Sequence, residues 1–280
     1  MSDGFTPDAP PLILDARDAA AFARGHAPGA AHLWAGAWDA HAAALPPRED
    51  AFVVVAEDEA TAQALVDRLV AGGHRAARVA PPTLCAERSE SGPSRRDAWR
   101  PSAWLLACAA GLVPGARVLD VACGSGRNLV ALARRGARAV GVDLLPDALE
   151  RARRLAGATA VDLVVADATA PLPFRDSAFD VVMGFRYLDR ALFPRLPSLL
   201  VAGGELWWET FGEEQARFGH PRRPEHLLAA GELGRLCRES GLEVMAVHES
   251  VAPGGRGPAL SAVRARRAAD PVLAAGSERA

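Results

Sequence analysis

The stretch "VLDVACGSGRN" at residues 118–128 decides how the middle of this chain is interpreted. It begins as an apolar run typical of a buried strand, and a helix-like pattern, "LVALARRG", follows it. Gly124 and Gly126 lie at the junction, where glycine lets the backbone approach a ligand closely. Free N–H groups at the start of the following helix favour a phosphate or a carboxylate. The pattern therefore predicts a nucleotide-binding turn.

The composition is that of an ordinary globular protein, with 280 residues, 50% hydrophobic and 24% charged. The formal net charge of -2 gives no global electrostatic reason to coat nucleic acid, so we do not expect a nucleic-acid partner. No apolar stretch approaches the roughly 20 residues of a membrane helix, and the N-terminus lacks the order of a signal peptide. The four cysteines are scattered, which favours a cytoplasmic location and argues against a metal site.

The chain separates into two α/β regions. Residues 10–80 alternate short apolar runs with helical patterns, which predicts a small domain with parallel strands. Residues 81–98 are rich in Pro, Ser, Gly and charge, and are interpreted as a linker. A second domain is expected at 99–267, followed by a flexible tail at 268–280.

Seven strands and a leading helix at 101–111 are predicted in the second domain, with helical patterns between most strands. Such alternation indicates a parallel sheet covered on both faces. The last two strands are joined by a stretch too short for a crossover helix, so the seventh strand should run antiparallel to its neighbours. The predicted strands are residues 117–121, 138–142, 161–165, 179–184, 204–211, 243–249 and 260–266.

Two common nucleotide motifs do not fit the central turn. A dinucleotide fingerprint requires a third glycine where Leu129 stands, and a P-loop requires a lysine, which this chain lacks. What remains is a G-x-G turn with Asp120 at the strand end. Asp143 and Asp167 follow at the ends of the next two strands, and Asp143 lies where a carboxylate takes a ribose hydroxyl pair.

In this order the motifs resemble the class I S-adenosylmethionine-dependent methyltransferases, over residues 100–266. "VLDVACGSGRN", "GVD", "ADA", "LPFRDSAFDVV" and "LLVAGGEL" carry the resemblance. It implies S-adenosylmethionine as cofactor, with its methionine part facing the glycine turn, its ribose on Asp143 and its adenine beside Asp167. The implied cofactor residues are Asp120, Ala122, Cys123, Gly124, Gly126, Asn128, Asp143, Leu144, Asp167, Ala168 and Phe185.

The second half also resembles the tellurite-resistance and thiopurine methyltransferase subgroup, in "RPSAWLL" and in residues 185–233. The resemblance implies a small acceptor, often with a sulfur-like nucleophile. Arg186 and Tyr187 are the candidate catalytic residues, just past the fourth strand. Residues 211–231 are interpreted as a lid over the sheet edge. The substrate candidates are Glu209 and the loop residues His220, Arg222 and Arg223, with His226 also considered as a proton acceptor.

The N-terminal region resembles a rhodanese domain, through "LDAR", "F-x-x-GH-x-PGA" and the "FVVV" strand. An active rhodanese has a cysteine directly after that strand, but Ala56 stands there, followed by the acidic run 57–59. The resemblance therefore implies a degenerate rhodanese-like domain without sulfurtransferase activity. Its expected role is docking, dimerisation or covering the other domain. We expect an α/β chain in which this parallel-sheet domain precedes a Rossmann-like, seven-stranded methyltransferase domain.

Three alternatives stay open. The methyltransferase could act on RNA or protein. The local basic cluster available for binding such a substrate is Arg95, Arg96 and Arg100. The chain could instead be a non-enzymatic S-adenosylmethionine-binding regulator. A sulfur relay through Cys85 is the third alternative.

Overall fold

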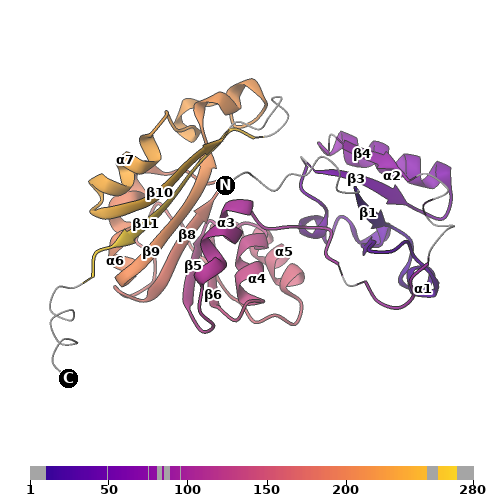
Figure 1. Cartoon of the computed structure of the whole chain (residues 1–280), viewed down its shortest axis with the longest axis horizontal. Helices are drawn as coiled ribbons and strands as arrows, with labels where there is room; N and C mark the ends of the chain where they lie inside the picture. Colours follow the sequence, from indigo (N-terminus) through magenta and orange to yellow (C-terminus); the bar gives the residue numbers. More distant parts are fainter. Residues whose placement is uncertain are drawn as a thin grey trace. The chain divides into compact units, whose positions relative to one another are not determined.

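The computed structural model describes residues 11–269, except 49, 75, 81–83, 85–88, 95 and 251–257. Cys85, Arg95 and most of the expected tail lie outside the described residues. The chain divides into two compact units, one up to Arg100 and one from Pro101 (Figure 1). Among the described residues, no helix is both long enough and apolar enough to cross a membrane.

The first unit is built on a four-stranded sheet in the order β2-β1-β3-β4. Its strands β1 (Leu12–Asp15), β2 (Ala31–His32), β3 (Ala51–Val55) and β4 (Ala76–Val79) pair in parallel, as the sequence predicts. Asp18 directly precedes helix α1 (Ala19–Arg24), and Asp58 directly precedes α2 (Glu59–Ala71). Both aspartates accept a hydrogen bond from a backbone N–H of the first turn, which is the capping contact that starts a helix.

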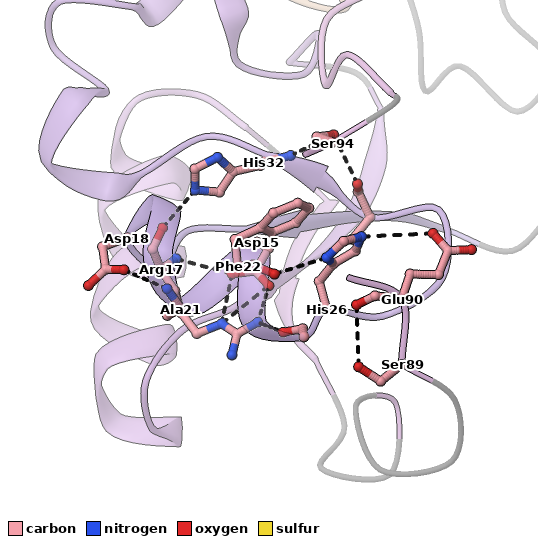
Figure 2. A network of polar contacts seen from close by, with 12 residues as sticks. Asp15, Arg17, Asp18, Ala21, Phe22, His26, His32, Ser89, Glu90 and Ser94 are labelled. Atoms are coloured by element: carbon pink, nitrogen blue, oxygen red, sulfur yellow. Dashed lines mark hydrogen bonds and ion pairs between the residues drawn. The ribbon is translucent and has the colours of Figure 1, made fainter. Parts of the chain in front are cut away.

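Part of the expected linker belongs to the first unit. Glu90 forms an antiparallel bridge with His26, and the Ser94 hydroxyl donates to the carbonyl of Ala30 (Figure 2). Ala98 joins the apolar core around Leu14 and Trp38, and is only 8% exposed. A polar composition predicted a linker at 81–98, but the Glu90 bridge, the Ser94 hydrogen bond and the buried Ala98 attach residues 89–94 and 96–98 to the unit.

A buried ion pair supports the start of the first unit. Asp15, which is fully buried, accepts from the Arg17 Nε at 2.9 Å and from its Nη2 at 2.6 Å. The same Nη2 donates to the carbonyl of Gly25, beyond helix α1 (Figure 2). His26 stacks on Phe22, with ring centroids 3.8 Å apart. These contacts fix the strand, the helix and the turn after it as one body.

The second unit holds a seven-stranded sheet in the order β10-β11-β9-β8-β5-β6-β7. Strand β11 is antiparallel to both β10 and β9, and every other neighbouring pair is parallel. The predicted antiparallel seventh strand is therefore confirmed. The strands are β5 (Arg117–Val121), β6 (Arg138–Asp143), β7 (Asp162–Val165), β8 (Phe179–Phe185), β9 (Leu200–Phe211), β10 (Leu242–Ser250) and β11 (Leu260–Arg267).

Helices cover both faces of this sheet (Figure 1). One face carries α3 (Ala103–Cys108), α4 (Arg127–Ala133) and α5 (Pro146–Ala156). The other carries α6 (Leu196–Leu199) and α7 (Glu232–Glu239). The core includes side chains from each sheet face, such as Trp208 on the α7 side and Trp207 on the α3 side. The carboxyl ends of the parallel strands therefore form a single edge at which ligands can bind.

Strand β9 starts earlier than predicted, at Leu200 instead of residue 204. The pairing with β8 shifts register between Phe179 and Val181, and Gly203 takes a φ of +75° inside the strand. A glycine with positive φ can form such an irregularity without steric cost, so the strand continues through the Gly-Gly pair instead of beginning after it.

The centre of the sheet depends on Gly184 in β8. A Cβ at this position would lie 2.4 Å from the Trp208 ring, which is fully buried. We expect Gly184→Ala to lower the free energy of unfolding by about 1–3 kcal/mol, because the ring has no space into which to move. Urea denaturation of both proteins measures this. Gly111→Ala is the matched control, since nothing lies within 4 Å of its Cβ position. Equal losses in the two variants would contradict the expectation.

Candidate functional site

The site begins at the turn between β5 and α4. Gly124 and Gly126 have φ angles of +54° and +76°, and Ala122 also has a positive φ of +55°. A Cβ on Gly126 would lie 2.8 Å from the Cβ of Ala152 in α5, so α4 and α5 approach closely only because this residue is glycine. The turn needs left-handed backbone at three positions, and glycine stands at two of them.

Asp143 holds this turn in place. Its Oδ2 accepts from the Gly124 N–H at 2.8 Å, and its Oδ1 accepts from the Leu145 N–H at 2.9 Å. The residue ends β6, the strand next to β5. One carboxylate therefore joins two neighbouring strand ends, and it is only half-buried, so it is accessible to a ligand.

Asp120 lies deeper, at 2% exposure. Burial, and then the nearby charge of Asp143, raise the pKa of this carboxyl well above its usual range, against the lowering effect of the Leu129 N–H. Burial likewise raises the pKa of the Cys123 thiol. Cys123 therefore keeps its proton at neutral pH and forms part of the wall instead of acting as a nucleophile.

A cavity of about 280 Å³ opens beside this turn. It collects residues from the ends of β5 and β8 and from the start of α4, as a site at the carboxyl edge should. Seven of the residues predicted from the sequence line it, together with Ser125 and Arg127. The seven are Asp120, Ala122, Cys123, Gly126, Asn128, Phe185 and Arg186.

A chain of polar contacts connects two of the wall residues, Asn128 and Arg186. The Asn128 Oδ1 accepts from the Ser102 N–H at 2.9 Å, and the Ser102 hydroxyl donates to the Glu209 Oε2 at 3.0 Å. The Glu209 Oε1 lies 3.6 Å from the Arg186 Nε, and the Arg186 guanidinium lies 4.9 Å from the centre of the Phe211 ring. These two contacts hold the side chain of Arg186, which has a φ of +61° and lines the cavity.

Sequence reasoning missed Ser102. It caps α3, with its hydroxyl also accepting from the Trp104 N–H, so a serine before a helical pattern was the available signal. That signal predicts a cap, but it does not reveal the contact with Glu209, which is 107 residues away in the sequence.

Several predicted residues are not among those that line the cavity. Leu144, at 59% exposure, follows β6, while Asp167 and Ala168 follow β7. Thr169 donates to the Asp167 carboxylate through its N–H and its hydroxyl, which lowers the pKa of Asp167. Tyr187 is half-buried, and burial, followed by the charge of Asp189, raises its pKa. Tyr187 therefore remains protonated and is poorly suited to act as a base.

The structure does not bring the three loop candidates to the cavity. His220, Arg222 and Arg223 are exposed, and none of them is among the residues that line it. Instead, Gln215 ties their loop down, since its amide donates to the His220 carbonyl and its Oε1 accepts from the Ala259 N–H. No group of three metal-ligating side chains occurs among the described residues.

Comparison with known proteins identifies the class. The family described as "Methyltransferase domain" matches residues 118–204. A demethylmenaquinone methyltransferase of Clavibacter sepedonicus is 45% identical over 82 residues, covering 28% of this chain and 33% of the relative. A ubiquinone biosynthesis O-methyltransferase of Xanthomonas campestris pv. campestris is 34% identical over 113 residues, covering 38% and 47%. The chain spans at most half the length of the curated relatives it matches.

Among solved structures, one titled "Conversion of a Disulfide Bond into a Thioacetal Group during Echinomycin Biosynthesis" aligns with a TM-score of 0.50 at 26% identity. It covers 65% of this chain and 89% of that chain. The second unit therefore contains a methyltransferase domain, and the family and fold of this domain imply S-adenosylmethionine as its cofactor. The glycine turn and Asp143 fit this cofactor, because they offer a close backbone approach and a carboxylate for a ribose.

The raised pKa of Asp120 makes cofactor affinity depend on pH. S-adenosylmethionine carries a sulfonium and an ammonium, so it favours the charged carboxylate. As the pH rises through the raised pKa of Asp120, affinity should increase, and binding at lower pH should release a proton. Calorimetry in buffers of different ionisation enthalpy measures both effects.

Asp120→Asn supplies the control for this expectation. The variant should bind the cofactor at least about tenfold more weakly, equivalent to about 1.4 kcal/mol, and without the pH dependence. A carboxyl whose pKa is raised by folding lowers the free energy of unfolding as the pH increases. Without cofactor, Asp120→Asn should therefore be more stable than the wild type at neutral pH. An identical pH profile in both proteins would contradict the assignment.

Proposed function

We propose that this chain transfers a methyl group from S-adenosylmethionine to a small-molecule acceptor with a sulfur- or selenium-type nucleophile. The observation that carries the proposal is the cavity at the β5–α4 turn, where Gly126 gives close approach and Asp143 stands at the neighbouring strand end. When bound, S-adenosylmethionine supplies an electrophilic methyl group. The protein's contribution to such a displacement is mainly to hold the reactants in line.

The polar chain along the cavity wall would provide that positioning. Ser102 fixes the Glu209 carboxylate, and Glu209 together with Phe211 fixes the Arg186 guanidinium at the cavity. Arg186 can pair with an anionic group of the cofactor or the acceptor. Tyr187 would contribute a neutral hydroxyl, because its raised pKa keeps the proton on the phenol.

The acceptor class rests on two arguments. A sulfur or selenium nucleophile needs no strong base, which agrees with the protonated Tyr187 and Cys123. The similar structure whose title names a disulfide and a thioacetal also concerns sulfur chemistry. The relative named as an O-methyltransferase favours an oxygen acceptor instead, so a screen must include phenols beside thiols and selenols.

For the first unit we propose a rhodanese-like fold that docks a protein partner or a second copy of this chain. Its parallel sheet and the helix α2 directly after β3 support that fold. Ala56 occupies the position after β3, and Asp58 caps the helix that follows it. A loop without a thiol and with three successive acids is unsuited to hold an anionic sulfur donor.

The cofactor proposal is tested by titrating the chain with S-adenosylmethionine and S-adenosylhomocysteine. Asp143→Ala should lower affinity for both by about 100-fold, near 2.7 kcal/mol, because a ribose partner and the support of the Gly124 N–H are lost together. Asp147→Ala is the control, since Asp147 is exposed in the first turn of α5. If the wild type binds neither ligand, the proposed function is wrong.

The first unit should show no thiosulfate:cyanide sulfurtransferase activity. Ala56 leaves the loop after β3 without a nucleophile, so the wild type and Cys85→Ser should both give only the uncatalysed background rate. Thiocyanate formation measures this. Activity in the wild type that Cys85→Ser abolishes would establish the sulfur relay and overturn the proposal of a non-catalytic unit.

A further inference from the structure

Arg186 stands at a left-handed turn directly after β8. Its φ is +61°, a backbone conformation that residues other than glycine rarely adopt. Contacts with β9 hold the turn, because the Arg186 N–H donates to the Glu209 carbonyl at 2.7 Å. The Trp208 indole N–H donates to the carbonyl of the next residue, Tyr187, at 3.0 Å. Strained backbone that its surroundings fix in this way is concentrated at binding and catalytic sites.

The guanidinium of Arg186 has one occupied side and one open end. Its Nε lies 3.6 Å from the Glu209 Oε1, and its central carbon lies 4.9 Å from the centre of the Phe211 ring. Within the described chain its two Nη groups donate no hydrogen bond, and 38% of the side chain is exposed. Parallel N–H groups of a guanidinium fit the two oxygens of a carboxylate. The open end therefore suits a carboxylate that enters the cavity from solvent.

The strand order places this guanidinium far from Asp143. Strands β9, β8, β5 and β6 are consecutive neighbours in the sheet (Figure 1), with Phe211 at the end of β9 and Asp143 at the end of β6. Neighbouring strands lie about 4.8 Å apart, so β9 and β6 are separated by about 14 Å. A cofactor with its ribose on Asp143 therefore leaves Arg186 on the opposite side of the glycine turn.

A carboxylate at Arg186 has two sources, the acceptor or the amino-acid end of the cofactor. The cavity wall contains a second cation, Arg127, which directly follows Gly126 and so belongs to the turn that faces the cofactor. Asp120, the one acid among the described wall residues, suits the ammonium or the sulfonium of the cofactor. The charges of the cofactor thus have counter-charges at the glycine turn, which leaves Arg186 for the acceptor.

We propose that Arg186 determines which acceptor is methylated, by pairing its two Nη groups with a carboxylate of that molecule. The inference rests on the proposed methyl transfer, and it narrows the acceptor to a small thiol or selenol that carries a carboxylate. The thiol or selenol loses its proton to water and gains the methyl group, while the carboxylate takes no part in the displacement. Its role is to hold the nucleophile in line.

The test compares 3-mercaptopropionate with 3-mercapto-1-propanol, which share length and nucleophile but differ in charge at neutral pH. Binding of each thiol to the full chain, saturated with S-adenosylhomocysteine, is followed by NMR titration. The carboxylate should bind at least about tenfold more tightly, a difference of about 1.4 kcal/mol. This preference should fall as the salt concentration increases, because part of it is electrostatic.

Variants of Arg186 test whether this residue causes the preference. Arg186→Met removes the charge and keeps a long side chain, so both thiols should bind with the weaker affinity of the alcohol. Arg186→Lys keeps the charge but loses the paired donors, so it should lower the preference at least about threefold. Arg153→Met is the control, since Arg153 pairs with Glu150 on α5 and does not line the cavity.

Two nucleosides separate the two sources of the carboxylate. S-adenosylhomocysteine carries the amino-acid end, whereas 5′-methylthioadenosine lacks it. If Arg186 serves the acceptor, Arg186→Met should change the affinity for either nucleoside by less than about threefold. A loss of affinity for S-adenosylhomocysteine alone would assign Arg186 to the cofactor and overturn the inference. If Arg186→Met binds neither nucleoside, Arg186→Lys decides the test instead.

Equal binding of the two thiols by the wild type, or an undiminished preference in either Arg186 variant, would also overturn the inference. Binding of S-adenosylhomocysteine without a preference for the carboxylate would remove only this inference and leave the proposed methyl transfer intact. A wild type that binds neither nucleoside would remove the proposed function, and this inference with it.

Discussion

The hydrogen bond between the Gly124 N–H and the Asp143 carboxylate, 2.8 Å long, is the contact on which the site depends. It ties the turn after β5 to the end of β6, so two neighbouring strands present their carboxyl ends at a fixed distance. Gly126 adds the second constraint, because α4 and α5 could not meet over a side chain at this position. The cavity exists because these two backbone requirements are satisfied together.

The same site places a buried carboxyl beside a half-buried one. Asp120 is nearly fully buried beside Asp143, and its raised pKa expresses the cost of charging it there. A cationic ligand beside this carboxyl would relieve that cost.

Much of this architecture was predictable from the sequence, because strand ends are marked by acids and glycines at regular steps. Asp120, Gly126 and Asp143 were placed correctly relative to the strands, and the antiparallel seventh strand followed from the length of one connection. Local patterns failed where the decisive contact was long-range. Ser102 meets Glu209 across 107 residues, and Glu90 pairs with His26 from a segment whose composition indicates a linker.

A crystal structure of the chain with S-adenosylhomocysteine tests the central claim most directly. The account predicts that the ribose hydroxyls contact Asp143 and that the amino-acid end occupies the cavity between Asp120, Asn128 and Arg186. Density for the ligand at any other place, or a cavity that stays empty at saturating ligand, would contradict the assignment of this turn as the cofactor site.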